Sequence, residues 1–361
     1  MHRTKKTAAA LGLTLMAAAF FFSFSLKDED AGLITVSTFG KQPTLATDQA
    51  GNLHVVFGRG NEIFYVRSAD GGLTYSAPQK TGEQAKLALG TTRGPQIVST
   101  QDYIVIAAAD HSGQIMAYRL KKGEKRWSDP VNILHSDSTA KEGFIAIAAG
   151  KGNDVYAAWL DLRIGHHNNI FGAYSHDAGK TWSESSLVYA SPDGRVCPCC
   201  RPSITADAKG NVYVMFRNDL RGSRDLYLAH SKDGGKSYAP AEKLGEGTWV
   251  FDQCPMDGGG ISLDPKGRIG TAWRRDKFVY YSEPGKSEVK IAEGRAPSLV
   301  RTSRGNYLAW QQGSEIAVLT PGKLAAEAIG TGIYPRLTAL ADQSVICVWE
   351  SDGRIVAKKL R

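Results

Sequence analysis

The chain has 361 residues, of which 42% are hydrophobic and 22% charged, and its formal net charge is +8 at neutral pH. Residues 1–26 contribute three of the positive charges and no negative one, so the remainder is only mildly basic. Lysines and arginines are interspersed with acidic residues and form no basic stripe, which argues against nucleic-acid binding. The length fits one large domain or two small ones.

The N-terminal segment, residues 1–26, has the pattern of a secretory signal. Basic residues precede an uncharged apolar run from Ala8 to Leu26, and the charged sequence 27–30 follows it. We therefore expect an exported protein, periplasmic or extracellular. The apolar run is long and no clean Ala-x-Ala cleavage site follows it, so an uncleaved membrane anchor stays open as an alternative.

A sequence unit recurs through residues 33–361, which we take as a single domain. It has the form Pro-x-Leu/Ile-x-x-Asp-x-x-Gly-Asn, followed by a strand that ends in an aromatic residue. Copies begin at positions 43, 95, 144, 202, 259, 297 and 335; those at 95, 144 and 335 are weaker, and Phe144 and Gly259 stand where the other units have proline. Each unit has room for four short strands and helical periodicity is nearly absent, so the sequence predicts an all-β propeller of seven blades.

The last unit has room for only three strands, at 335–340, 344–349 and 353–359. The strand-like segment 33–37 precedes the first unit and lacks a partner. We predict that it supplies the fourth strand of the last blade, because this closes the ring and removes the exposed sheet edges.

Three segments share the pattern Ser-x-Asp-x-Gly-x-Thr/Ser-aromatic, and their aspartates are Asp70, Asp177 and Asp233. Asp bonds nearby backbone amides and Gly tolerates positive φ, so each segment predicts a β-hairpin tip. The pattern resembles the Asp box, or BNR repeat, of the sialidase-like β-propellers, in which it is a structural staple. Sialidases have six blades, so a six-bladed propeller is the alternative to the seven units of this sequence.

In a propeller, the loops between strands 2 and 3 share one face with the links from strand 4 to the next strand 1, and the Asp boxes lie on the opposite face. The loops on the first face are rich in polar residues. They are 161–169, 217–225 and 274–276, together with the links 195–201 and 251–260. Surplus loop length on one face is typical of a functional site. We therefore expect the functional site at the mouth of the central tunnel on this face, between blades 3 and 5.

The resemblance implies glycan binding, and it raises glycoside hydrolysis of the exo-sialidase type, which needs a cationic cluster, an acid and a nucleophile. Asp161 or Asp219 would be the acid and Tyr334 the nucleophile. The full set of catalytic candidates is Asp161, Arg163, Arg217, Asp219, Arg221, Arg224, Arg274, Arg295, Tyr334 and Arg336. Further ligand-binding candidates are Arg93, His166, His167, Arg201 and Asp257.

The sialidase motif Phe/Tyr-Arg-Ile-Pro is not matched, because Lys41 stands two residues before Pro43. The candidate arginines and aspartates could equally pair with one another across loops. Whether the protein is an enzyme therefore stays open at this point, with a glycan or small anionic ligand expected either way.

Four of the five cysteines, Cys197, Cys199, Cys200 and Cys254, lie in two successive links that should be neighbours in space. In an exported protein we expect disulfides, with Cys254 bridged to the 197–200 turn and no cofactor. The alternative is a thiolate site for copper or another soft ion, formed by these cysteines with Met256 and the nearby histidines. Cys-x-Cys-Cys is not a standard zinc spacing.

A third interpretation involves no catalysis. The protein would be a monomeric propeller whose cysteine- and arginine-rich mouth binds a metal ion or a partner protein. On this reading His166 and His167 are solvated loop residues. The tryptophans at equivalent strand-2 positions are expected to pack the blades and not to bind sugars. They are Trp159, Trp273, Trp310 and Trp349.

Overall fold

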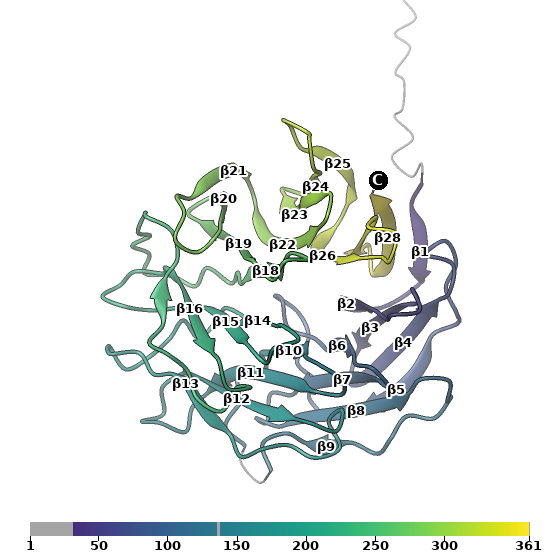
Figure 1. Ribbon diagram of the computed structural model, residues 1–361, viewed down its shortest axis with the longest axis horizontal. Helices are drawn as coiled ribbons and strands as arrows, with labels where there is room; N and C mark the ends of the chain where they lie inside the picture. Colours follow the sequence, from purple (N-terminus) through teal and green to yellow (C-terminus); the bar gives the residue numbers. More distant parts are fainter. Residues whose placement is uncertain (1–31, 136–137, 361) are drawn as a thin grey trace, which may run out of the picture. The chain divides into compact units, whose positions relative to one another are not determined.

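The computed structural model describes residues 32–135 and 138–360. These residues form seven four-stranded antiparallel sheets arranged in a ring and contain no α-helix (Figure 1). The predicted seven-bladed propeller is confirmed, and the six-bladed alternative is wrong. The proposed signal or anchor, residues 1–26, lies outside the described residues. Among the residues that are described, no helix is long and apolar enough to cross a membrane.

Within blades 1 to 3 the strands pair in sequence order from the centre of the ring outward. Blade 1 consists of β2 (Lys41–Thr47), β3 (Leu53–Arg59), β4 (Glu62–Ser68) and β5 (Gln79–Glu83). Blade 2 consists of β6 (Gln96–Ser99), β7 (Tyr103–Ala109), β8 (Ile115–Lys121) and β9 (Val131–Asn132). Blade 3 consists of β10 (Ile145–Ala149), β11 (Val155–Asp161), β12 (Asn169–Ser175) and β13 (Ser186–Tyr189).

Blades 4 to 6 repeat this order. Blade 4 consists of β14 (Ser203–Ala206), β15 (Val212–Arg217), β16 (Leu226–Ser231) and β17 (Glu242–Lys243). Blade 5 consists of β18 (Gly259–Leu263), β19 (Ile269–Arg275), β20 (Phe278–Ser282) and β21 (Val289–Glu293). Blade 6 consists of β22 (Arg295–Thr302), β23 (Gly305–Gln312), β24 (Glu315–Leu319) and β25 (Glu327–Thr331).

Blade 7 is completed by the other end of the described chain. It consists of β26 (Ile333–Ala339), β27 (Val345–Ser351), β28 (Arg354–Leu360) and β1 (Ile34–Ser37). β1 pairs antiparallel with β28, with Ile34 opposite Ala357 and Thr35 opposite Val356, and the two strands lie side by side in Figure 1. The predicted closure by residues 33–37 is therefore confirmed.

The hydrophobic core lies between adjacent blades, because each sheet buries both of its faces. Every residue of β11 is buried, and Trp159 at its end packs with Val105 and Ala107 of the neighbouring blade 2. At most 2% of the surface of each strand-2 tryptophan is exposed. The four tryptophans therefore pack the blades, as predicted, and are not sugar platforms.

The Asp boxes are hairpin tips held by their own side chains. In the box of blade 3, Asp177 Oδ1 accepts the Thr181 amide at 2.8 Å and Oδ2 accepts its hydroxyl at 2.7 Å. Ser175 Oγ donates to Asp177 and accepts the Gly179 amide. Asp70 and Asp233 make the equivalent bonds in blades 1 and 4. In all three boxes the aspartate holds the turn that follows it.

Hydrogen bonds between loops identify the two faces of the ring. The Asp box of blade 3 bonds to the turn between strands 1 and 2, where the Ala178 amide donates to the Asn153 carbonyl. The link into blade 4 bonds instead to 2–3 loops, since the Val196 amide donates to Asn168 and the Cys197 amide donates to Arg217. The Asp boxes and the polar loops are therefore on opposite faces, as predicted.

Candidate functional site

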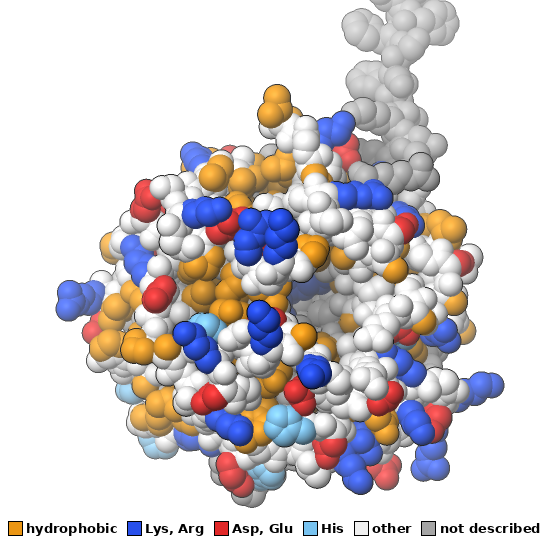
Figure 2. Space-filling view, viewed as in Figure 1, with side chains coloured by type: hydrophobic (Ala, Val, Ile, Leu, Met, Phe, Trp, Pro, Cys, Tyr) orange, Lys and Arg blue, Asp and Glu red, His pale blue; other side chains and the backbone are white. Residues whose placement is uncertain are grey.

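A cavity of about 200 Å³ occupies the centre of the ring. The innermost strand of every blade contributes to its wall, so the cavity is the central channel of the propeller. Polar side chains line it against an aliphatic background; they are Thr44, Gln96, Arg201, Ser203, Ser298 and Arg336. Lys and Arg side chains stand around the central hollow in Figure 2.

Two arginines from different blades project their charge into this channel. Arg201 immediately precedes blade 4 and Arg336 lies on β26 of blade 7. Protein surrounds both guanidiniums, and this burial lowers the pKa of Arg336 to about 10, while burial and the charge of Arg336 lower the pKa of Arg201. Within the described residues neither forms a salt bridge with a carboxylate. Arg201 donates instead to the Gln96 side chain, at 2.5 Å.

Arg93 and Tyr334 lie close enough to these groups to interact electrostatically, so the structure brings both candidates to the same mouth. The charge of Arg93 is coupled to Tyr334, Cys199 and Cys254, and Tyr334 is also coupled to Arg336. Arg93 Nε donates to the Glu142 carbonyl at 2.7 Å, and its guanidinium stacks on the Phe144 ring.

Tyr334 has a backbone φ of 57°, in the left-handed region that is uncommon for a residue other than glycine. Gln42 and Ala296 adopt the same conformation at equivalent positions, each directly before the proline that begins a blade. The ladder of each of these blades shifts register at this point. The left-handed backbone conformation is therefore a feature of the residue that precedes a blade-starting proline. It does not mark Tyr334 as a functional residue.

Asp257 is a fully buried carboxylate whose charge acts on Arg336. Its Oδ2 accepts the Ala296 amide at 3.0 Å and lies 3.8 Å from Arg274 Nη1, while Oδ1 has no hydrogen-bond partner. Burial raises the pKa of Asp257 to about 6, although Arg217 and Arg274 oppose the shift. Arg295 lies beside this group and donates to the Met256 carbonyl.

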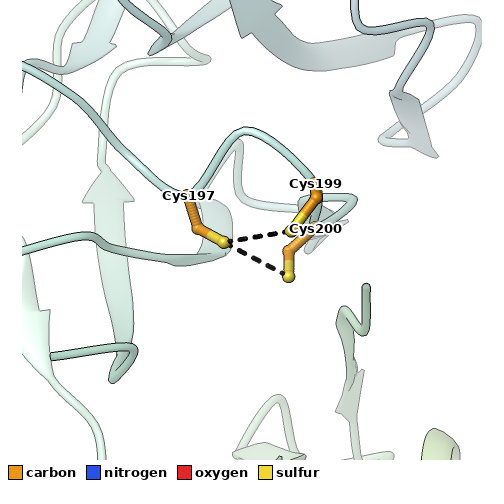
Figure 3. A group of neighbouring side chains, drawn as sticks. All are labelled: Cys197, Cys199 and Cys200. Atoms are coloured by element: carbon orange, nitrogen blue, oxygen red, sulfur yellow. Dashed lines mark hydrogen bonds between the residues drawn. The ribbon is translucent and has the colours of Figure 1, made fainter. Parts of the chain in front are cut away.

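Three cysteines form a buried cluster next to the channel mouth (Figure 3). Cys197 Sγ lies 3.6 Å from Cys199 Sγ and 3.5 Å from Cys200 Sγ, and all three sulfur atoms lie within 4.8 Å of one another. Hydrogen bonds from the other two thiols, with the charge of Arg217, lower the pKa of Cys197 to about 3. Burial and the neighbouring thiol group raise the pKa of Cys200 to about 12.

The expected disulfide between Cys254 and the 197–200 turn is not formed. All five cysteines of the chain lie in the described residues, and each is a free thiol. Cys254 is exposed and lies outside the three-sulfur cluster, because the link 251–257 approaches the turn through Asp257 and not through its cysteine. Met256 is also exposed, and Cys347 is buried in blade 7, as expected of a core thiol.

Several catalytic candidates are already engaged in hydrogen bonds and salt bridges within the protein. Asp161 is fully buried and accepts hydrogen bonds from Thr139, Trp159 and Arg163. These bonds outweigh the effect of burial and lower its pKa. Asp219 forms salt bridges with Arg195 at 2.8 Å and with Arg224 at 2.6 Å. Neither aspartate has the unpaired, proton-holding carboxyl group that a general acid needs.

Arg217 has a structural role, because it holds together the loops of two blades. It is almost completely buried and donates to the backbone carbonyls of Asp257, Arg224 and Arg274. It therefore joins blades 4 and 5, and it is not part of the channel lining. His166, His167 and Arg221 are exposed on loop tips, away from the channel lining.

Sequence reasoning missed Gln96, which lines the channel and holds Arg201. A signal for it exists: the residue directly after a blade-starting proline faces the channel in five blades. These residues are Thr44, Gln96, Ser203, Ser298 and Arg336. The mouth was expected between blades 3 and 5, whereas the channel site also includes blades 2 and 7.

Comparisons with known proteins agree with the fold. The BNR/Asp-box repeat family matches residues 173–184, the box of blade 3. No curated protein matches the chain significantly. Virginiamycin B lyase from Staphylococcus aureus is 13% identical with a TM-score of 0.55, over 91% of this chain and 98% of that chain.

Two further solved structures align over almost the whole chain. An ulvan lyase, a polysaccharide lyase bound to a GlcA–Rha3S saccharide, is 12% identical with a TM-score of 0.54, over 90% of this chain and 94% of that chain. A protein of unknown function from Dyadobacter fermentans is 16% identical with a TM-score of 0.52, over 92% and 98%. At these identities the likeness concerns the fold alone. The protein is a seven-bladed β-propeller that carries BNR/Asp-box repeats.

Proposed function

We propose that the protein binds an anionic glycan in its central channel, with Arg201 and Arg336 holding the acidic group. The observation that carries the proposal is the pair of half-buried arginines in the channel wall, neither of which forms a salt bridge within the described residues. Arginine binds carboxylate, sulfate or phosphate groups through charge-assisted hydrogen bonds. An anionic ligand would supply the missing countercharge.

The remaining lining supports a saccharide as the carrier of that charge. Thr44 and Ser298 place hydroxyl groups between aliphatic residues of the wall. Thr44 already donates to the Pro95 carbonyl and can still accept, and Ser298 accepts the Leu337 amide and can still donate, which suits sugar hydroxyls. The same fold holds an acidic saccharide in the ulvan lyase, which supports the choice of ligand class but transfers no residue to this chain. The signal-like pattern of residues 1–26 supports binding outside the cytoplasm.

Calorimetric titration with sialic acid, glucuronate oligosaccharides and neutral oligosaccharides tests this function. We expect binding of acidic glycans only, weakened by salt. The Arg336→Ala and Arg201→Ala variants should each lose more than about tenfold in affinity, as expected for a lost charged hydrogen bond. Arg304→Ala, on an exposed turn of the opposite face, is the matched control. Equal binding of neutral glycans, or full affinity in Arg336→Ala, would refute the proposal.

A second candidate is hydrolysis of such a glycan, supported by Tyr334 beside Arg93 and Arg336. Asp257, whose pKa is raised to about 6, would be the proton-holding carboxyl group. A fluorogenic sialoside assay separates the two functions. Turnover that Tyr334→Phe abolishes while binding persists would establish hydrolysis, and binding without turnover would leave a binding protein.

A further inference from the structure

The three thiols of the 197–200 turn are not used by the proposed channel function. The turn connects β13 to β14, and all three side chains are buried. Figure 3 shows their sulfur atoms turned toward one another. Three thiols gathered in this way, with no disulfide among them, require an explanation of their own.

The spacing of the sulfur atoms fits a shared ligand better than a covalent bridge. Three sulfur donors at about 2.3 Å from one metal ion lie about 3.8–4.0 Å from one another. The two measured separations are 3.6 and 3.5 Å, whereas the sulfurs of a disulfide are only about 2.05 Å apart. Small movements of the side chains would open the cluster to metal-binding distances.

The backbone holds this turn in place at both ends. The Cys197 amide donates to the Arg217 carbonyl at 3.1 Å, and Cys200 Sγ accepts the Asp257 amide at 3.4 Å. Arg217 is itself fixed by three carbonyls from blades 4 and 5. The cluster is therefore preorganised, which lowers the cost of binding an ion.

We propose that Cys197, Cys199 and Cys200 form a three-coordinate thiolate site for Cu(I). Soft thiolate ligands favour Cu(I), and the cluster as described contains sulfur ligands alone. Structural zinc sites are almost always four-coordinate, and the exposed Cys254 lies outside this group. The site is separate from the channel arginines and does not depend on a glycan ligand.

The charges around the cluster suit an anionic complex. Three thiolates with one Cu⁺ carry a net charge of −2. The guanidinium of Arg217 acts on Cys197 and Cys200, and that of Arg224 acts on Cys197 and Cys199. On loading, each thiol that is still protonated releases its proton to solvent, and neither copper nor sulfur changes oxidation state.

The test uses the full chain under anaerobic conditions, with Cu(I) supplied as its bicinchoninate complex. Wild type should remove one Cu(I) per chain from the chelator, and three thiols should then resist alkylation. X-ray absorption should report three sulfur neighbours at about 2.3 Å. Zn(II) at the same concentration should leave the three thiols open to alkylation.

Two cysteine variants test whether the bound Cu(I) lies in the three-thiol cluster. Cys254→Ser, which alters the exposed cysteine outside the cluster, should bind as wild type does. Cys199→Ser should weaken Cu(I) binding by at least about tenfold, with circular dichroism to verify folding, as expected when one of three metal ligands is lost. The thiol-protection count on wild type makes the test independent of whether this variant folds.

Three results would contradict the proposed Cu(I) site. The first is unprotected cluster thiols in copper-loaded wild type. The second is equal Cu(I) affinity in Cys199→Ser and wild type. The third is a Cys197–Cys200 disulfide in protein purified without reductant and mapped by peptide analysis. Loss of glycan binding in the channel variants would not affect any of these measurements, so the two proposals can fail separately.

Discussion

The backbone amide of Asp257 donates a hydrogen bond to the sulfur of Cys200, across 3.4 Å. The Asp257 carboxylate, on the same residue, accepts the amide of Ala296 in blade 6. One residue of the link into blade 5 therefore contacts both the thiol turn and the strand that begins the next blade. Because this link also approaches the channel arginines, the thiol cluster and the anion site share a wall.

Loss of a channel arginine should stabilise the fold. Arg336 lies half-buried in the channel wall, with Arg201 as its repelling neighbour and no salt bridge. We expect Arg336→Met to raise the free energy of unfolding by about 1 kcal/mol, because the cost of burying an unpaired charge disappears. The same variant should lose anionic glycan binding. Urea denaturation and calorimetric titration measure the two effects.

The contrasting control is Arg301, which is more deeply buried than Arg336 and is paired. Its guanidinium donates to Glu283 at 2.6 Å and to the Arg268 carbonyl at 2.7 Å. Arg301→Met should destabilise the protein by about 1–3 kcal/mol, since Glu283 and the Arg268 carbonyl each lose a charged hydrogen bond while Glu283 keeps Lys286. A loss of stability in both variants would contradict the view that Arg336 lacks a countercharge.

The Asp box should contribute stability without contributing to binding. Asp177→Ala removes hydrogen bonds to the Thr181 amide and hydroxyl. We expect the free energy of unfolding to fall by about 1–2 kcal/mol, with unchanged glycan and Cu(I) binding because the box lies on the opposite face. Asp129→Ala, at an exposed site, should change neither quantity. A variant with wild-type stability and no binding would refute the assignment of the faces.

Closure of the ring should depend on β1. A chain that begins at Gly32 keeps this strand, and one that begins at Lys41 lacks it and exposes the edge of β28. We expect the shorter chain to melt at a lower temperature and to self-associate, because an open edge pairs with other chains. Thermal melts and size-exclusion chromatography compare the two. Identical behaviour would mean that β1 does not contribute to closure in solution.

The pH dependence of stability should carry the signature of His54. Its ring contacts Tyr65 Oη at 2.7 Å and Asp48 at 3.3 Å, and burial lowers its pKa to about 4. Between pH 6.5 and 4 the unfolded chain binds a proton that the folded protein does not, so stability falls as the pH falls. The loss should approach about 3 kcal/mol.

His54→Gln removes this titration and isolates the effect. Denaturation series from pH 7 to pH 4 should show a smaller loss of stability in the variant than in wild type. Parallel curves for the two proteins would show that His54 is protonated as readily in the folded state as in the unfolded state.

The sequence by itself determined the architecture of this protein. Seven repeat units, five of which begin with proline, predicted the blades. The Asp-box turns of Asp70, Asp177 and Asp233 predicted the faces, and the unpaired segment 33–37 predicted the closure. These features could be predicted because turn chemistry and the spacing of strands are local, and because a closed ring leaves a single place for an orphan strand.

Only the tertiary structure decided which side chains are available for function. Arg224 forms a salt bridge with Asp219, whereas Arg201 and Arg336, from different blades, line the same channel and form no salt bridge within the described residues. Cys254 was expected to join the other cysteines and does not. Charge pairing and sulfur geometry depend on distances of a few ångströms between different blades, and these are set by the paths of loops that no local pattern encodes.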